Sequence, residues 1–429
     1  MKYLIIAAVV IVIVAVIIVL IYRNRKSVPV PAAGWQLFDA ATQTISDTTV
    51  HQRMSGVYTI TKGNEHFGDL AVLKWTWTRH GQDTVYYLSM FCQKDGTHII
   101  CEGRSVNDQL LFKGYWRSMH DENTGTAHFT VSRTNGAAYL LGKGEAVDTP
   151  GIAIEGSWTR GDDSARQEVA LRYQRPLFAG ESFEIIGHRG GGRNTERLPA
   201  SENSVEMVQM ASRLGATGVE IDVQTTKDGV PIIYHDPTIN MRLVKGKWIP
   251  GHATDTYTWA EIREMKLKNN ERIPELREML DTIINSTPLR FIWLDIKTTG
   301  ALPLISEIRA EYEQKARAAG RKVEIVLGIA NEEGVARFVA LPGYQNIPSL
   351  CELDPPVVQR MNARIWAPQW TNGLERAQVE EVQAQGRRVF VWTLDDDEDI
   401  REFMHQGDYN GIVTNYCSAV AFHFYSRQR

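Results

Sequence analysis

The stretch TGVEIDVQTTKDGVPIIYH, residues 217–235, carries the pattern that decides the fold of the second half of the chain. Its two apolar runs, TGVEIDV and VPIIYH, are predicted strands, and ionisable side chains close both of them. Glu220 and Asp222 close the first run, and His235 closes the second. Because Glu220 and Asp222 are two residues apart on one strand, both side chains point to the same face of the sheet.

The same arrangement returns at other strand ends. His188 follows EIIG, Asp295 and Lys297 end FIWLDIK, and Trp392 ends RVFVW. The active sites of (β/α)8 barrels are built on the rim at the C-terminal ends of the strands. Chemistry-bearing side chains at several different strand ends therefore favour such a barrel over a doubly wound open sheet.

The order of elements from about residue 181 leads to the same fold. Predicted helices near 203–214, 259–285 and 303–319 alternate with the apolar runs FEIIG, TGVEIDV, VPIIYH, RFIWLDI, VEIVLG, RVFVWTL and GIVTN. Alternation of this kind indicates a parallel α/β sheet. The available length is close to the ~250 residues of a (β/α)8 barrel. We therefore predict an α/β fold of the TIM-barrel type over residues 181–429.

The segment before this barrel has a different composition. Residues 35–175 contain short runs rich in β-branched and aromatic residues, separated by turn signals, which predict a small all-β barrel or sandwich of unknown role. Trp75, Trp77, Trp116 and Trp158 form either a binding cleft or part of its core. The prolines of residues 27–34 indicate a linker before this domain.

The N-terminus predicts a membrane anchor over residues 1–26. Every residue from Leu4 to Tyr22 is apolar or the closing tyrosine, and Arg23, Arg25 and Lys26 follow at once. That run is close to the ~20 residues that a helix needs to cross a bilayer. We expect a single-pass membrane protein, and the positive-inside tendency leans slightly toward a cytoplasmic body.

Charge and cysteine content exclude some functions. A net charge of −4 argues against non-specific binding of nucleic acid, which needs a basic field. The four cysteines show no zinc-binding spacing. Cys92 and Cys101 either face each other across a hairpin or, with Cys351 and Cys417, are buried thiols.

Several motifs now combine. The segments HRGGGR, LPASENS and GATGVEIDVQTTKDGVPIIYHDPTI resemble the glycerophosphodiester phosphodiesterase family, whose hallmark is His-Arg, then Glu-Asn-Thr/Ser, then Glu-x-Asp, then His-Asp. The resemblance extends over residues 183–425 and includes IPELREML, LDIK, VWTLDDDED and GIVTN. It does not include the β-rich part. It implies a TIM barrel that hydrolyses glycerophosphodiesters to sn-glycerol 3-phosphate and an alcohol, with one divalent metal ion, Ca²⁺ or Mg²⁺.

The resemblance also implies a role for particular residues. His188 and His235 match the two catalytic histidines, and Arg189 and Lys297 match the cations on the phosphate. The metal ligands would be Glu220, Asp222 and Asp295, and the substrate-binding residues would be Trp392 and Glu202. These residue types suit the reaction, because a hard cation held by carboxylates stabilises the charge of the displacement at phosphorus. Two histidines can divide the acid and base roles.

Two positions depart from the family pattern. Asp295 stands where the family usually has Glu, and Asn415 stands where its final motif usually has Asp. Other polar residues have plainer interpretations. Asp236 is expected to form a turn before Pro237, Asn203 is either part of the Glu-Asn pair or a helix cap, and residues 395–397 are expected to be a solvated loop.

Three functions are compatible with the sequence. The first is an active glycerophosphodiester phosphodiesterase acting on a small-molecule substrate. The second is a lysophospholipase D-like or other phospholipid phosphodiesterase, which the predicted anchor would suit. The third is a non-catalytic module that binds sugar phosphates or the cell envelope, and replacement of a catalytic position would favour it.

Overall fold

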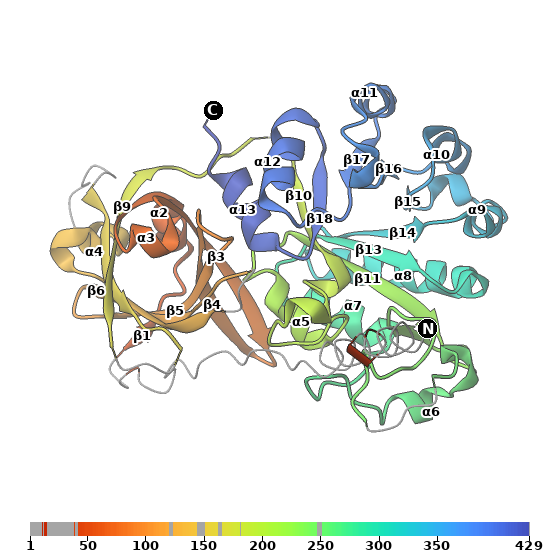
Figure 1. The fold of residues 1–429 in the computed structure, drawn as a ribbon, viewed down its shortest axis with the longest axis horizontal. Helices are drawn as coiled ribbons and strands as arrows, with labels where there is room; N and C mark the ends of the chain where they lie inside the picture. The colour runs from red at the N-terminus through yellow and green to blue at the C-terminus, as the bar shows by residue number, and fades with distance from the viewer. Residues whose placement is uncertain are drawn as a thin grey trace, which may run out of the picture.

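The computed structural model describes residues 11, 13, 14, 38, 42–119, 123–143, 151–161, 165–180, 182–246 and 251–428. Two closed barrels lie side by side along the long axis of the molecule (Figure 1). The N-terminal barrel is at the left of that view and the C-terminal barrel is at the right, with helix α13 between them.

The C-terminal barrel is a ring of eight parallel strands in the described part of the chain. The ring closes because β10 pairs with β11 on one side and with β18 on the other. The predicted TIM barrel is therefore confirmed. Its strands are β10 (Glu184–Gly187), β11 (Gly218–Thr225), β13 (Phe291–Ile296), β14 (Glu324–Ile329), β15 (Ser349–Cys351), β16 (Ile365–Trp366), β17 (Arg388–Val391) and β18 (Gly411–Thr414).

Helices surround this ring and cover its outer face (Figure 1). They form because their apolar residues recur at helical spacing: in α7, Leu276, Met279, Leu280, Ile283 and Ile284 are buried, and the other face is more exposed. The helices are α5 (Val205–Ala211), α6 (Trp259–Ile262), α7 (Leu276–Ser286), α8 (Leu302–Ala318), α9 (Glu332–Val339), α10 (Pro355–Met361), α11 (Arg376–Ala384), α12 (Asp397–Gln406) and α13 (Cys417–Tyr425).

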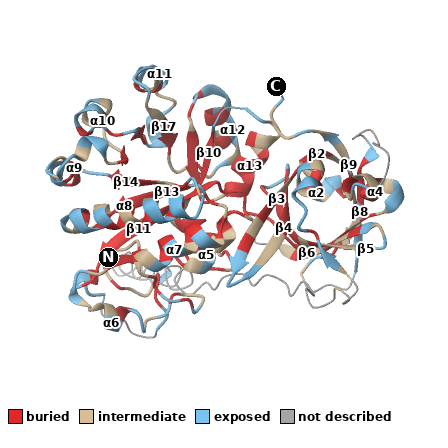
Figure 2. Cartoon of the chain, turned by 180° about the vertical axis from the view of Figure 1, so that it is seen from behind, coloured by how far each residue is buried: buried red, intermediate tan, exposed pale blue. Residues whose placement is uncertain are grey.

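Strands of the ring are buried on both faces, as Figure 2 shows by their red colour. Ile186, Phe291, Trp293 and Phe390 fill the inside of the ring, while alternate residues pack outward under the helices. Burial on both faces explains why these strands appear in the sequence as continuous apolar runs.

One predicted strand differs from the expectation. The run VPIIYH forms β12 (Pro231–Ile233), which pairs antiparallel with β11 and lies outside the closed ring. Only residues 226–230 connect the two strands, and so short a connection allows a hairpin but not the crossover that a parallel strand needs. His235 therefore follows a hairpin strand rather than a strand of the barrel.

The N-terminal domain is also a closed barrel. Within the described ranges, β2 to β9 pair with their neighbours in sequence order, all antiparallel, and β2–β9 pairing closes the ring. The sequence left barrel and sandwich open, and the structure is an up-and-down barrel. Its elements are β1 (Gln43–Thr44), α2 (Thr48–Met54), β2 (Gly56–Lys62), α3 (Asn64–Phe67), β3 (Leu70–His80), β4 (Asp83–Cys92), β5 (His98–Val106), β6 (Gln109–Arg117), β7 (Thr124–Val131), α4 (Ala137–Leu140), β8 (Ala153–Trp158) and β9 (Gln167–Arg175).

Aromatic side chains fill the inside of this second barrel. Trp116 and Trp158 are fully buried there, together with Phe67 from α3. The indole N–H of Trp116 donates to the carbonyl of Thr159 at 2.8 Å. These two tryptophans are thus core residues rather than part of a cleft. All four cysteines are free, buried thiols.

The outer face of β3 and β4 packs against the C-terminal barrel. Val72, Tyr87 and Phe91 belong to the same apolar cluster as the helices of that barrel. Polar contacts add to this interface, because the Ser418 hydroxyl in α13 donates to the carbonyl of Gly96 at 3.0 Å. The outer face of the N-terminal barrel therefore joins the apolar cluster of the C-terminal barrel, while the inside of the N-terminal barrel is a separate core.

The predicted membrane anchor over residues 1–26 is wrong. A helix that crosses a bilayer needs about 20 continuous apolar residues, and no helix among the residues that the structure describes combines such length with such an apolar character. The longest of them, α8, has 17 residues and carries charged side chains. Within the anchor segment the described residues are Ile11, Ile13 and Val14, and the others lie outside the described residues. The membrane localisation that was inferred from this anchor is therefore also wrong.

Candidate active site

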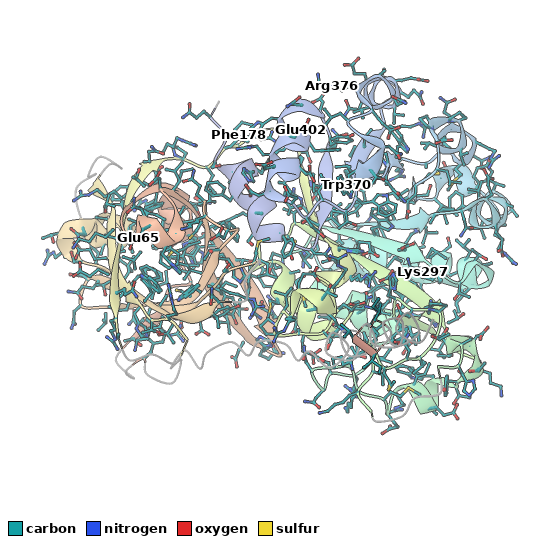
Figure 3. The ribbon with its side chains drawn as sticks, in the orientation of Figure 1. Glu65, Phe178, Lys297, Trp370, Arg376 and Glu402 are labelled. Carbon is teal, nitrogen blue, oxygen red and sulfur yellow. The ribbon has the colours of Figure 1, made fainter. Side chains whose placement is uncertain are left out.

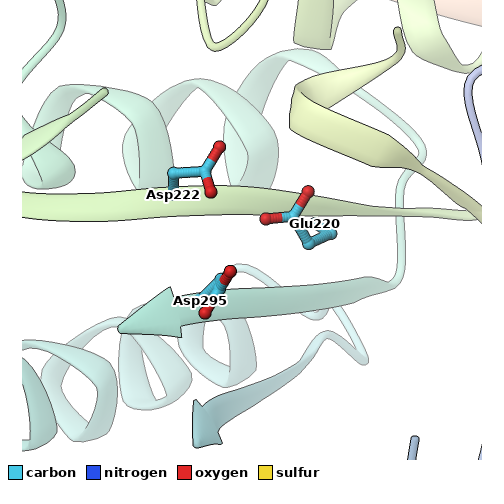
Figure 4. A group of neighbouring side chains, drawn as sticks. All are labelled: Glu220, Asp222 and Asp295. Atoms are coloured by element: carbon cyan, nitrogen blue, oxygen red, sulfur yellow. The ribbon is translucent and has the colours of Figure 1, made fainter. Parts of the chain in front are cut away.

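Three carboxylates meet at the C-terminal rim of the TIM barrel. Glu220 and Asp222 point inward from β11, and Asp295 points inward from β13 (Figure 4). The parallel register sets Asp222 directly beside Asp295. One oxygen from each residue lies within 4.8 Å of the other two, and all three side chains are buried.

The electrostatics of this cluster are unfavourable without a cation. Burial and the charges of Asp222 and Asp295 raise the pKa of Glu220 well above its usual range. Lys297, labelled in Figure 3, supplies one positive charge, with its ammonium 3.1 Å from Asp222 Oδ1 and in contact with Asp295. Burial alone would lower the pKa of Lys297, but the three carboxylates raise it above its usual value.

The cluster fits a divalent metal ion. Glu220 Oε1 and Asp295 Oδ1 are buried oxygens without a hydrogen-bond partner in the described chain. An orphaned buried acceptor is costly unless something else satisfies it. Carboxylate oxygens are the ligands that Ca²⁺ and Mg²⁺ prefer. The donor set and the two orphaned oxygens therefore match the metal group that the sequence predicted.

The HRGGGR segment forms a tight loop above the cluster. Arg189 adopts the left-handed conformation with φ 53°, and its backbone N–H donates to Glu220 Oε2 at 2.7 Å. This conformation is uncommon for a non-glycine residue, and the hydrogen bond to Glu220 helps to hold Arg189 in it. Gly190 (φ 85°) and Gly191 (φ 153°) lie tightly against Val208 and Met207 of α5, so added Cβ atoms there would meet these side chains at 3.0 and 2.9 Å.

His188 is held by a chain of polar groups. Asn415 donates from Nδ2 to Asp395 Oδ2 at 2.7 Å, which turns its Oδ1 toward His188. His188 Nδ1–H therefore donates to Asn415 Oδ1 at 2.9 Å, and Nε2 faces the cluster 3.9 Å from Glu220. Burial and the charge of Arg189 lower the pKa of His188 to about 4. His188 is thus a neutral imidazole near pH 7.

Asp395 was expected in a solvated loop, and the structure places it differently. Its two oxygens accept from Asn415 and from Arg193, so it is a partner of the site. Asn415, which replaces the more usual aspartate, is therefore itself bound to a carboxylate. The family's aspartate at position 415 would place a negative charge directly beside His188. In this chain the negative charge is on Asp395, which contacts Asn415.

His235 has a carboxylate partner of its own. Its Nδ1–H donates to Asp236 Oδ1 at 2.7 Å, and Arg189 Nη2 donates to its Nε2 at 2.8 Å. Arg242 binds both oxygens of Asp236, at 2.6 and 2.9 Å. Burial alone would raise the pKa of Asp236, but hydrogen bonds from His235, Arg242 and Asn240 hold it well below its usual range. Asp236 is thus more than the turn residue that the sequence suggested.

Glu202 and Asn203 lie underneath the site. The Glu202 carboxylate is 1% exposed and accepts from Arg189 at 2.8 Å and from Arg242 at 3.0 and 3.1 Å. It therefore fixes two arginines. Asn203 donates to Asp222 Oδ2 at 2.7 Å, whereas the N-cap of α5 is Ser204. The cap interpretation of Asn203 is therefore not what the structure shows.

Comparison with known proteins adds a decisive observation. The model of the glycerophosphoryl diester phosphodiesterase family matches residues 188–419. This range is more than half of the chain, and it contains every site residue described above. The chain belongs to this family. It is therefore a phosphoric diester hydrolase, and the resemblance predicted from the motifs is confirmed.

Individual members of the glycerophosphoryl diester phosphodiesterase family show how far the likeness extends. A glycerophosphodiester phosphodiesterase of Caldanaerobacter subterraneus is 27% identical over 242 residues, covering 54% of this chain and 93% of that relative. A probable glycerophosphodiester phosphodiesterase 2 of Mycobacterium tuberculosis is also 27% identical, over 54% of this chain and 86% of its own. A solved glycerophosphodiester phosphodiesterase of Parabacteroides distasonis is 20% identical, with a TM-score of 0.45 over 55% of this chain and 94% of that chain.

Trp392 lies at the C-terminal end of a strand of the parallel barrel. It follows β17, is half-buried, and donates its indole N–H to the carbonyl of Ala367 at 2.8 Å. It lines a cavity of about 420 Å³ together with Arg193 and the exposed Trp370, which Figure 3 labels. The aromatic residue that the sequence singled out therefore faces open space at the rim.

Sequence reasoning missed Glu352. It follows β15 directly, and its burial and the charge of Asp295 raise its pKa to about 8. Because it directly follows the C-terminal end of a strand of the ring, it lies at the same rim as Asp295. The run PSLC before it is short and was not identified as a strand, and a strand assignment there would have pointed to Glu352.

Proposed function

We propose that this phosphoric diester hydrolase converts a glycerophosphodiester to sn-glycerol 3-phosphate and an alcohol in a metal-dependent reaction with two histidines as acid and base. One observation carries the proposal. Two imidazoles, each fixed through Nδ1, border a cluster of three buried carboxylates. The groups that would bind the cation and the phosphate and transfer the protons are thus close together, which supports the proposal.

Glu220, Asp222 and Asp295 would hold the metal ion. When bound, a divalent cation stabilises the negative charge that develops on the phosphoryl oxygens. Ca²⁺ or Mg²⁺ is the expected ion because all three ligands are carboxylates.

Arg189 and Lys297 would bind the phosphate of the diester. Arg189 is held near the cluster by Glu202, and Lys297 by Asp222 and Asp295, so both positive charges are in place before a substrate binds. Trp392 would contact the part of the substrate beyond the phosphate, because it lines open space at the same rim.

His188 and His235 would divide the proton transfers. As the bond from water oxygen to phosphorus forms, one imidazole takes the proton of the water. As the bond from phosphorus to the departing oxygen breaks, the other gives that oxygen a proton. Hydrogen bonds to Asn415 and Asp236 fix Nδ1 of each ring, so Nε2 would be the atom that exchanges protons. At His235 this exchange would require release of the hydrogen bond that Arg189 donates to Nε2.

The test is product release by the full chain from a panel of glycerophosphodiesters and lysophospholipids, with and without chelator. We expect sn-glycerol 3-phosphate from the diesters, its loss after chelation, and its return with Ca²⁺ or Mg²⁺. Asp295→Asn should weaken metal binding, so a higher concentration of added metal should be needed to restore turnover. Glu398→Gln, at an exposed carboxylate on α12, is the matched control. Full turnover after exhaustive chelation contradicts the metal role, and turnover of lysophospholipids alone contradicts the substrate class.

A further inference from the structure

The wall of the N-terminal barrel is incomplete next to α2. Strand β2 begins at Gly56 and pairs with β3 only from Leu70 to Leu73. From Lys74 onward, the edge of β3 on that side has no strand partner within the described ranges. Helix α2 lies beside this free edge, and a cavity of about 550 Å³ remains between them. Cavities of this size at the mouth of a β-barrel are typical of small-molecule sites.

Aromatic rings form the walls of this cavity. His51 of α2 stacks on Trp75 with the ring centroids 4.1 Å apart, and Tyr86 lies 5.1 Å from His51. Trp77 stands opposite Tyr86 in the register of β3 and β4, so the two rings share one face of the hairpin. Unlike Trp116 and Trp158, these side chains are only half-buried. They offer flat apolar surfaces to a bound ring.

The charged groups at the cavity are all positive. Lys74 and Arg79 line it, and no aspartate or glutamate does so among the residues that the structure describes. Arg79 and Arg321 lie 5.7 and 5.9 Å from the centre of the Trp77 ring. Arg321 donates its hydrogen bonds to backbone carbonyls, those of Ile284, Thr287 and Leu289. Neither arginine forms a salt bridge with a described carboxylate, so this end of the cavity attracts an anion.

Two buried polar atoms at the cavity also lack partners. They are the indole nitrogen of Trp75 and the hydroxyl of Thr76, and neither has a hydrogen-bond partner within the part of the chain that is described. Buried polar groups are normally satisfied, and a bound molecule can supply the missing partner. Both atoms can donate, which suits a ligand rich in oxygen acceptors.

We propose that this cavity is a second ligand site that binds a phosphorylated ring compound. The ring would lie against Trp75, Trp77 and Tyr86, and the phosphate would bind the guanidinium of Arg79, which matches phosphate oxygens with its planar fork. A cationic ligand is excluded by the two lining cations and the absence of a lining carboxylate in the described chain. The site lies on the N-terminal barrel and is separate from the hydrolytic rim.

Binding to the full chain is measured by tryptophan fluorescence and calorimetry in the presence of chelator, which suppresses metal-assisted binding at the hydrolytic rim. Glucose 6-phosphate and adenosine monophosphate are the two phosphorylated probes, and they distinguish a sugar from a nucleoside as the ring. Glucose, adenosine and inorganic phosphate are the matched controls. We expect one phosphorylated probe to bind at least about tenfold more tightly than its ring or phosphate alone, because a charge-assisted hydrogen bond contributes that much.

Variants locate the bound probe. Arg79 is exposed, so Arg79→Gln should fold normally, and it should weaken binding about tenfold or more while hydrolysis of the diester is unchanged. Arg172→Gln, an exposed arginine on β9 of the same barrel, is the control. Two results overturn the proposal: neither phosphorylated probe binds, or the bound probe is insensitive to Arg79→Gln and to Trp77→Phe and is lost instead in Lys297→Met.

Discussion

The two barrels of this chain place their strand ends differently. In the parallel barrel, every strand ends at the same rim, so single residues such as Glu220 and Asp295 on different strands meet there. In the antiparallel barrel, successive strands end at opposite rims, so strand-end residues are divided between two sides. Its inside is occupied by aromatic residues such as Trp116 and Trp158.

This difference explains why one barrel carries the hydrolytic site. A cluster of titratable groups forms where several strands bring side chains to the same place. Parallel strands do this because all their C-terminal ends lie at the same rim. In this antiparallel barrel the inside is filled by side chains, and the cavity beside α2 lies where the wall is interrupted, next to Lys74. Catalysis should therefore be sensitive to substitutions at the rim of the parallel barrel, and stability to substitutions inside the antiparallel barrel.

The largest effect is expected for the histidines. His188→Ala or His235→Ala should lower kcat by about 10²–10⁴-fold, the usual loss for a general acid or base. The KM should change much less, since Arg189 and Lys297 still bind the phosphate. A nitrophenyl diester needs little protonation of its departing oxygen, so it should rescue only the variant of the acid. His80→Ala, an exposed histidine on β3, is the control, and near-normal kcat in both variants on the natural diester contradicts the acid–base role.

Inside the antiparallel barrel we expect the reverse result, in which a substitution lowers stability and leaves activity unchanged. Trp116→Ala should lower the free energy of unfolding by about 3–5 kcal/mol, because it leaves a large cavity and an unpaired carbonyl at Thr159. The activity of the folded fraction should stay near normal. Chemical denaturation and active-site titration measure the two quantities. Trp370→Ala, at an exposed tryptophan, should leave stability almost unchanged, and an equal loss in both variants would contradict the core role of Trp116.

Arg117 tests how far the two barrels are independent. It extends from β6 to the carbonyls of Glu196 and Arg197, at 3.2 and 3.1 Å, in the loop that carries Arg193. Arg117→Met should cost about 1.5–3 kcal/mol of stability, the range for hydrogen bonds to a charged group. It should also lower kcat, because the loop borders the cavity at Trp392. Lys113→Met, at a half-buried lysine of the same strand, is the control. Unchanged kcat in folded Arg117→Met would show that the antiparallel barrel does not support the site.

The smallest effect concerns pH and the metal. The pKa of Glu220 is raised, so at low pH it holds a proton that a bound cation must displace. Apparent metal affinity should therefore fall as the pH drops through that pKa, by up to about tenfold per pH unit for one proton. Calorimetry in buffers of different ionisation enthalpy measures the released proton. Glu220→Gln should abolish that release, and an affinity that is the same at all pH values would contradict the ligand role.

Local sequence patterns were sufficient for the larger features. The alternation of apolar runs and helices predicted the parallel barrel. The strand-end residues Glu220, Asp222 and Asp295 were recognisable because the position of a residue along a strand determines the face to which its side chain points. β15 and β16 escaped prediction because three and two residues are too few for a periodic signal. The all-β domain could be recognised by composition, but closure depends on the pairing of β2 with β9, which no local pattern encodes.

The polar partners of the site depended on contacts between distant segments. Asp395 and Asn415 follow different strands, and only the barrel brings them to His188. Arg242 lies after the β12 hairpin and reaches Glu202 across the rim. Such pairs form through space, so their residues look like ordinary loop residues in the sequence.

The order of pairing also has a consequence during synthesis. The antiparallel barrel is complete once residue 175 has emerged, whereas the parallel barrel closes only when β18 reaches β10. Domains fold as they leave the ribosome, N-terminal first. The apolar face of Val72, Tyr87 and Phe91 therefore stays incompletely covered until the C-terminal barrel has formed, because α13 at the end of the chain packs on it together with α7. We expect ribosome-bound chains stopped near residue 405 to have a protease-resistant antiparallel barrel that binds chaperones or hydrophobic dyes through this face. Release of the full chain should abolish that binding.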